Sequence, residues 1–219
     1  CDKKGTRLSQ VLKQAKASPE HYSELKKLVG SEVYREVKRD KTEVQLPKEY
    51  KPLSSITSDN IVGRHALAYL KKRGITKYDV LKYNIGYCKQ GLYANMIIIP
   101  SYDQNNQLNF YVARSFNRSY AKYKNPEASK DIIVFENLIN WNQPIIICEG
   151  VFDAMAIRRN AVPILGKNIS KSLLKKIVTS KVKEIYIALD RDALKKAVKF
   201  CEQFISMGKK VYLVDMDEK

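Results

Sequence analysis

The stretch IIICEGVFDAMAI, residues 145–157, predicts the fold of the C-terminal part of this 219-residue chain. Its first four residues form a short apolar run rich in β-branched side chains, which is typical of a buried strand. The run stops at Glu149 and Gly150, and the apolar spacing that follows predicts a helix over 152–160. A lone carboxylate therefore lies where a buried strand gives way to a helix.

Apolar runs and helical segments alternate from this stretch to the end of the chain. Strands are expected at 145–148, 162–165, 184–189 and 210–214, and helices at 152–160, 170–179 and 193–207. The apolar face expected for the last helix consists of Leu194, Ala197, Val198, Cys201, Phe204 and Ile205. Such alternation predicts an α/β fold with a parallel sheet flanked by helices.

The preceding part of the chain has a different organisation. Helices are expected at 8–17 and 20–29, and the charges, prolines and Ser/Thr cluster of residues 38–60 predict a linker. A helix that stops at Gly74 and a short helix over 77–83 follow, and residues 96–100 and 108–115 have the pattern of an antiparallel hairpin. We therefore expect a smaller α+β subdomain before the parallel sheet.

The composition is strongly basic, with 40 Lys and Arg against 23 Asp and Glu and a formal net charge of +17. Nucleic acid is the leading partner class for such a charge, and a lysine-rich surface without this partner is the alternative. No apolar run approaches the roughly 20 residues that span a bilayer, and no signal peptide is recognised. We expect a cytoplasmic protein without a membrane partner.

Acidic residues follow three of the four expected parallel strands. Glu149 follows the first strand, Asp190 and Asp192 follow the third, and Asp215, Asp217 and Glu218 follow the fourth. Ligands of an open parallel sheet bind beyond the carboxyl ends of its strands. If these strands are neighbours, their carboxylates converge on one edge and require a cation. Oxygen ligands without nearby His or Cys favour Mg²⁺, an ion that serves phosphoryl transfer. A metal site at these strand ends is the expectation.

Simpler interpretations account for the same carboxylates without a metal. Asp192 can act as the N-cap of the helix that begins near Ala193. Glu149 can be a solvated loop residue whose charge is favourable near a helix N-terminus.

Several motifs resemble known families in the same order along the chain. CEGVFDAMAI, LGKN and ALDRDALKKAVKF resemble the successive motifs of the Toprim domain, the catalytic module shared by primases, topoisomerases and some nucleases. Upstream, ALAYLKKRGITKYDVLKYNIGYC, MIIIPSYDQNNQLNFYVARSF and KYKNPEA resemble the polymerase core of bacterial-type (DnaG-like) DNA primases. The resemblance implies a basic primase subdomain at 61–141 and a Toprim domain at 142–219 that is truncated at its C-terminus.

The resemblance implies an Mg²⁺-dependent nucleotidyltransferase, a DNA-dependent RNA polymerase that makes short RNA primers for DNA replication. Glu149, Asp190 and Asp192 would be its catalytic residues and would bind Mg²⁺ or Mn²⁺. Its partners would be a single-stranded DNA template, ribonucleoside triphosphates and a replicative helicase, in a bacterial cell or a phage-infected host. Asp215 and Asp217 are candidates for a further acidic motif, which can equally begin beyond Lys219.

Basic and aromatic side chains lie on the segments that resemble the nucleotide-binding and template-binding parts of primases. They are Arg114, Arg118, Lys122, Tyr123, Lys124 and, in the LGKN motif, Lys167. Such a segment can pair with phosphates and stack on bases, and a solvated basic loop is the alternative. The sequence departs from the family at Ala94-Asn95, where an Arg is usual, and at Ala193-Leu194, where an Ala-Gly pair is common.

The N-terminus, CDKKGTRLSQVL, is similar to the tail of the zinc ribbon that precedes many primase cores, so residues 1–37 are assigned to that tail and its following helices. A ribbon needs four ligands, and Cys1 supplies one at most. Zn²⁺ is therefore expected only in a longer chain, and the four cysteines show no spacing typical of a disulfide framework.

Three other functions compete with the primase. A Toprim-type metal-dependent nuclease would use the same acidic residues with water as the nucleophile, but it leaves the upstream motifs unexplained. A topoisomerase needs a tyrosine nucleophile within a much larger clamp. A non-enzymatic nucleic-acid-binding module would use the acidic residues only as caps and turns.

Overall fold

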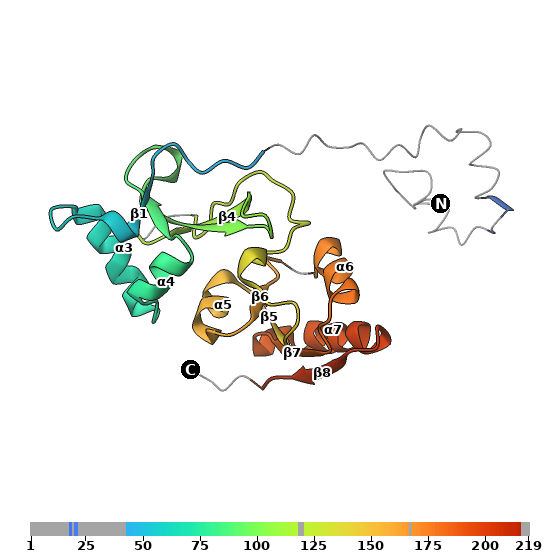
Figure 1. Ribbon diagram of the computed structural model, residues 1–219. Helices are drawn as coiled ribbons and strands as arrows, with labels where there is room; N and C mark the ends of the chain where they lie inside the picture. Colours follow the sequence, from blue (N-terminus) through green and yellow to red (C-terminus); the bar gives the residue numbers. More distant parts are fainter. Residues whose placement is uncertain (1–17, 19, 22–42, 118–120, 167, 216–219) are drawn as a thin grey trace. The chain divides into compact units, whose positions relative to one another are not determined.

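A computed structural model describes residues 18, 20–21, 43–117, 121–166 and 168–215. The chain divides into two units, residues 1–42 and 43–219, and the second unit contains two four-stranded sheets (Figure 1). The helices expected at 8–17 and 20–29 fall almost wholly outside the described residues.

The first sheet is antiparallel and has the strand order β1-β2-β3-β4. Its strands are β1 (Tyr50–Pro52), β2 (Gly86–Cys88), β3 (Met96–Tyr102) and β4 (Leu108–Ser115). The long pair β3 and β4 runs from Met96 opposite Ser115 to Tyr102 opposite Leu108. This pair confirms the hairpin predicted from the apolar runs on either side of the polar turn.

The segment 38–60 differs from the linker that the sequence predicts. Its described part includes β1, which pairs with β2 along the edge of the sheet, and Leu53, which is only 2% exposed. A proline can occupy an edge strand, because a missing N–H on the open side costs no ladder hydrogen bond. Three residues are also too few to show an alternating pattern, so composition suggested a linker where the chain completes a sheet.

Two helices, α3 (Ile61–Lys72) and α4 (Lys77–Lys82), lie between β1 and β2 in the chain. The side chain of Asn60 accepts a hydrogen bond of 2.9 Å from the backbone N–H of Gly63, which caps α3. Thr76 and Asp79 form a capping box at the start of α4. These caps explain why the helices begin where they do, and both helices bury apolar residues in the core of this sheet.

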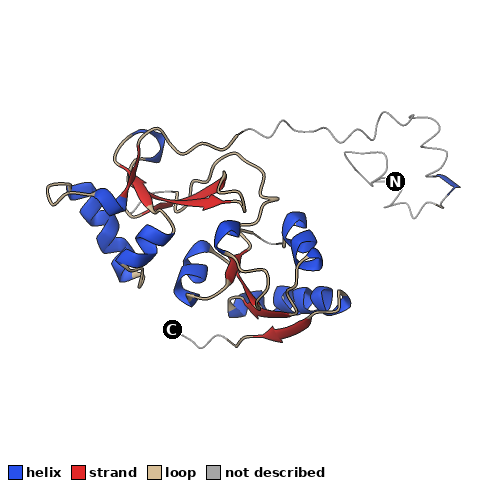
Figure 2. Cartoon of the chain, viewed as in Figure 1, coloured by secondary structure: helices blue, strands red, loops and turns tan. Residues whose placement is uncertain are grey.

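The second sheet is parallel and has the strand order β6-β5-β7-β8. Its strands are β5 (Ile145–Cys148), β6 (Ala161–Pro163), β7 (Glu184–Ala188) and β8 (Lys210–Leu213), and its helices are α5 (Val151–Ile157), α6 (Lys171–Thr179) and α7 (Leu194–Ser206) (Figure 2). This arrangement confirms the predicted α/β class, a parallel sheet flanked by helices and preceded by another subdomain, which is built on the antiparallel sheet and is not smaller as predicted. Among the described residues, no helix is both long and apolar enough to cross a membrane.

The buried face of α7 differs from the predicted one. Ala197, Phe200 and Phe204 are at most 3% exposed, whereas Leu194, Val198 and Ile205 are 54%, 45% and 58% exposed. The sequence contains more apolar residues than one face of the helix can bury, because a helix that covers a sheet buries a stripe of limited width. Apolar spacing alone therefore identified the buried Ala197 and Phe204, but it omitted Phe200 and included three exposed residues.

Candidate active site and nucleic-acid interface

Glu149 lies at the carboxyl end of β5, one of the two inner strands of the parallel sheet. The preceding residue, Cys148, is fully buried, and Glu149 itself is half-buried. The backbone N–H of Gly150 donates a hydrogen bond of 2.9 Å to Oδ2 of Asp153. Asp153 therefore supplies the acidic cap of α5, and the carboxylate of Glu149 stays available for another role.

Asp190 and Asp192 lie in the turn that follows β7, where both side chains are exposed. Ala193 occupies the N-cap position of α7, and no side chain caps that helix. The interpretation of Asp192 as a helix N-cap is therefore wrong. The structure gives neither aspartate side chain a hydrogen bond or ion pair within the part of the chain that it describes.

The strand ends that carry these acids are neighbours. β5 pairs with β7, with Cys148 opposite Ala188, so Glu149 and Asp190 follow their strands by one and two residues. β8 pairs with β7 on its other side, and Nη2 of Arg191 lies 3.7 Å from Oδ1 of Asp215. We call this edge of the parallel sheet, where its strands end, the carboxyl edge. Asp217 and Glu218 lie outside the described residues.

The donor set at the carboxyl edge fits a hard divalent cation. The possible ligands among the described side chains that follow β5, β7 and β8 are the carboxylate oxygens of Glu149, Asp190, Asp192 and Asp215, and oxygen is the ligand that Mg²⁺ prefers. Within the described residues, no three His, Cys, Asp or Glu side chains are gathered closely enough to hold a metal by themselves. Mg²⁺ commonly takes one or two carboxylates and completes its shell with water and substrate phosphates, so a complete protein cage is not required.

A lysine that the sequence analysis did not single out contacts this acidic set. Nζ of Lys196, on α7, lies 3.0 Å from Oε1 of Glu149 and donates a hydrogen bond of 3.1 Å to the carbonyl oxygen of Gly166. Helical spacing places Lys196 on the polar face of α7, which predicts exposure. Spacing contains no information on which strand end that face meets.

Arg114 is a largely buried residue of β4 and not part of a flexible loop, with 7% of its surface exposed. Its guanidinium carbon lies 4.6 Å from the ring centroid of Tyr123, which is 47% exposed. The backbone of the segment that contains Tyr123 pairs with β4, since Ser115 N–H donates to Lys122 O and Lys124 N–H donates to Ala113 O. The predicted basic segment is therefore held against the sheet where it is described.

Tyr69 on α3 connects two guanidinium groups. Its phenol oxygen accepts hydrogen bonds from Nε of Arg73 at 2.9 Å and from Nε of Arg114 at 2.8 Å. The guanidinium carbon of Arg73 also lies 4.7 Å from the ring centroid of Phe152, on α5, three residues after Glu149. Neither Tyr69 nor Arg73 was predicted, although the basic run KKRG at the end of α3 is a signal that could have identified Arg73.

The remaining predicted site residues have different outcomes. The side chain of Lys122 is exposed, and Nζ of Lys124 donates a hydrogen bond of 3.3 Å to the carbonyl oxygen of Leu92. Cys1, Arg118 and Lys167 lie outside the described residues, and their expected roles remain predictions.

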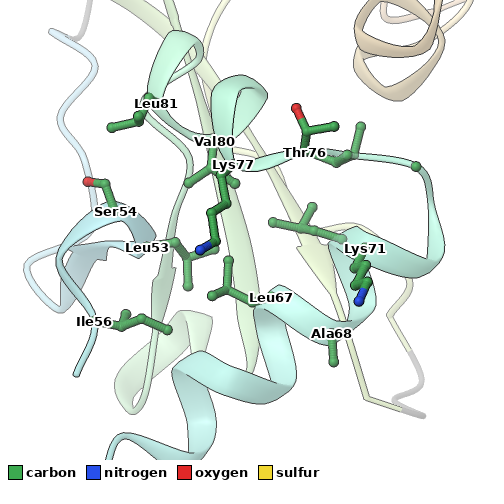
Figure 3. A pocket seen from close by; sticks show the side chains of 13 residues that line it. Leu53, Ser54, Ile56, Leu67, Ala68, Lys71, Thr76, Lys77, Val80 and Leu81 are labelled. Atoms are coloured by element: carbon green, nitrogen blue, oxygen red, sulfur yellow. The ribbon is translucent and has the colours of Figure 1, made fainter. Parts of the chain in front are cut away.

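An apolar cavity of about 690 Å³ lies in the first subdomain, where η2 (Leu53–Ser55), α3 and α4 meet. Leu53, Leu67 and Val80 line it, and Figure 3 shows the side chain of Lys77 extending into it. All its lining residues fall between Leu53 and Leu81, so it includes none of the acids at the carboxyl edge. It is a separate feature from the candidate active site.

Comparison with known proteins shows similarity of structure. No protein-family model matches the sequence, and no curated protein matches it. Solved structures of DnaG-type primase catalytic domains do match, at low sequence identity. The chain therefore has the α/β fold of a primase catalytic core.

Three of these structures give the extent of the likeness. The Aquifex aeolicus primase, with its zinc-binding and RNA polymerase domains, is 24% identical with a TM-score of 0.58, over 71% of this chain and 50% of that one. A DNA primase domain from Pseudomonas aeruginosa is 20% identical with a TM-score of 0.62, over 77% and 68%. A DnaG primase catalytic domain bound to single-stranded DNA is 17% identical with a TM-score of 0.59, over 72% and 65%. The match thus spans half of the solved Aquifex chain.

Proposed function

We propose that this chain is the catalytic core of a DNA primase, a nucleotidyltransferase that joins ribonucleotides on a single-stranded DNA template. The observation that carries the proposal is the placement of Glu149 and Asp190 at the ends of neighbouring parallel strands, on a fold shared with primase cores. Ligands of open α/β sheets bind at this edge. The subdomains would be those expected from the sequence, at 61–141 and 142–219.

Glu149, Asp190 and Asp192 would hold Mg²⁺ or Mn²⁺ at the carboxyl edge. When bound, such an ion supplies positive charge to the reacting phosphate and lowers the pKa of an attacking hydroxyl. Asp190 and Asp192 are exposed and have no described side-chain partner, so binding an ion breaks no internal contact of theirs. The side chain of Glu149 is less exposed than those of the two aspartates. It follows a buried strand directly, and the strand fixes its direction.

The basic segment would hold the template or the nucleotide. Lys122 is exposed and can pair with phosphate oxygens. Arg114 is only 7% exposed, so a phosphate would reach it through the guanidinium N–H groups beyond the one given to Tyr69. The exposed ring of Tyr123 can stack on a base while its other face covers Arg114. Support for a DNA template comes from the similar DnaG domain that was solved with single-stranded DNA. Arg118 and Lys167 are proposed to extend this surface, and a replicative helicase is the proposed protein partner.

Extension of an RNA primer annealed to single-stranded DNA tests the proposal. The purified chain would be supplied with labelled ribonucleoside triphosphates and Mg²⁺ or Mn²⁺, so that an initiation step is not required. We expect extended products from the unaltered protein and none from Glu149→Gln or Asp190→Asn. Glu202→Gln is the matched control, because it removes an exposed carboxylate of α7 away from the strand ends.

The same assay separates the primase from the rival nuclease. Metal-dependent loss of the template, without incorporation of ribonucleotides, would overturn the primase proposal in favour of a nuclease at the same acids. Saturable DNA binding without incorporation or cleavage, unaffected by Asp190→Asn, would instead identify a binding module.

A further inference from the structure

The carboxyl edge contains a cation of its own in the ammonium group of Lys196. It lies 3.0 Å from Oε1 of Glu149, and the two side chains are 23% and 35% exposed. The second bond, to the carbonyl oxygen of Gly166, fixes the ammonium between the loop after β6 and the end of β5. A half-buried pair with a second hydrogen bond is better ordered than a typical surface ion pair.

We propose that Lys196 competes with the divalent cation for Glu149 and so weakens metal binding to the free protein. This inference rests on the proposed function, because it requires Glu149 to be a metal ligand. An ammonium at hydrogen-bonding distance occupies one carboxylate oxygen, and two cations at the same carboxylate repel each other. Loading the metal therefore requires the ammonium to leave Glu149.

The nucleotide resolves this competition. A triphosphate brings negative charge and oxygen ligands for the cation, and it offers the released ammonium a new partner. Lys196 thus lowers the affinity for a metal ion that binds alone more than the affinity for a metal ion that binds together with nucleotide. The charge of Glu149 is thereby balanced between reactions without a permanently bound metal.

The alternative role for Lys196 predicts the opposite change. If the ammonium holds Oε1 while the metal binds Oε2, Lys196 orients Glu149 for the metal. Removing the ammonium would then weaken metal binding, whereas under competition removal strengthens it. The direction of the change separates the two roles.

Titration of Mn²⁺ into the full chain, followed by the electron paramagnetic resonance signal of the free ion, measures this affinity directly. We expect Lys196→Met to bind Mn²⁺ at least fivefold more tightly than the unaltered protein. Lys195→Met is the matched control, because it removes the same charge from the adjacent exposed position on α7, where no contact to Glu149 is present. Glu149→Gln identifies the part of the binding that depends on Glu149.

Adding a non-hydrolysable triphosphate should bring the affinities of the unaltered protein and Lys196→Met closer together. Equal or weaker Mn²⁺ binding by Lys196→Met, with Glu149-dependent binding in both proteins, overturns the competition and leaves the proposed function intact. An equal gain in Lys195→Met also overturns it, because net charge would then explain the effect. Absence of Glu149-dependent binding in every variant overturns both the inference and the proposed metal site.

Discussion

The phenol oxygen of Tyr69 accepts a hydrogen bond of 2.8 Å from Nε of Arg114. The same oxygen accepts a bond from Arg73, and the ring of Tyr123 covers the guanidinium of Arg114. Arg114 is therefore held on two sides, and the direction of its remaining N–H groups is fixed. A guanidinium that is ordered in advance loses less freedom when it binds a phosphate.

Tyr69→Phe should weaken single-stranded DNA binding while leaving the fold intact. The substitution removes one oxygen atom, which frees both guanidinium groups without creating a cavity. We expect a loss of roughly fivefold in affinity, since a hydrogen bond of this kind contributes about 1 kcal/mol. Fluorescence anisotropy with a labelled oligothymidylate, at one fixed salt concentration, measures it.

Tyr78→Phe controls for the loss of a phenol hydroxyl, because Tyr78 is 69% exposed on α4 and contacts neither arginine. Equal DNA affinity in Tyr69→Phe and in the unaltered protein would show that Tyr69 does not prepare Arg114 for binding.

Phe200→Ala and Val198→Ala test which face of α7 meets the parallel sheet. Phe200 is 3% exposed within the core, so its truncation should lower the free energy of unfolding by about 3–5 kcal/mol. Val198 is 45% exposed, and its truncation should cost about 0.5 kcal/mol or less. Urea unfolding monitored by circular dichroism gives both values, and similar losses from the two variants would contradict the observed face.

Strands, and the acidic residues at their ends, were more predictable from the sequence than contacts between side chains. Residues 145–148 were predicted as a strand, and β5 has the same bounds. A short β-branched run followed by Glu-Gly has few alternatives to a strand. Since all strands of a parallel sheet end at one edge in the same direction, the strand pattern placed Glu149 and Asp190 at that edge. The pairing of β5 with β7, which makes their strand ends neighbours, came from the structure.

Contacts between distant segments were not predictable in this way. Tyr69 and Arg114 are 45 residues apart, and Lys196 and Glu149 are 47 residues apart. No local pattern reports such pairs, because they depend on how elements pack and not on how each one forms. The same reason explains the error at β1, whose pairing with β2 is a property of the sheet and not of its own three residues.

Gly86→Ala should destabilise the antiparallel sheet at β1. A Cβ atom at Gly86 would overlap the ring of Tyr50 and lie 2.6 Å from the carbonyl oxygen of Lys51, so the β1 backbone would have to move. We expect a loss of about 1–3 kcal/mol in the free energy of unfolding. Gly166→Ala is the control, since the nearest atom to its Cβ would be 4.0 Å away. Equal stability of the two variants in urea unfolding would show that β1 does not pack against Gly86.

The three described cysteines should differ in reactivity, because burial raises the pKa of their thiols to different extents. Burial, assisted by the charge of Glu49, raises the pKa of Cys88 to about 11, and burial raises that of Cys148 as well. Only a thiolate attacks a chromogenic aryl disulfide. In a Cys1→Ser background at pH 8, we expect the half-buried Cys201 to react first, and Cys88 and Cys148 to react only when the protein unfolds. Because a raised pKa favours the neutral thiol in the folded state, the contribution of Cys88 to stability is complete below its ordinary pKa of 9.0 and is lost as the pH rises through about 11. Rapid labelling of all three thiols at pH 8, with native circular dichroism, would contradict the burial of Cys88 and Cys148.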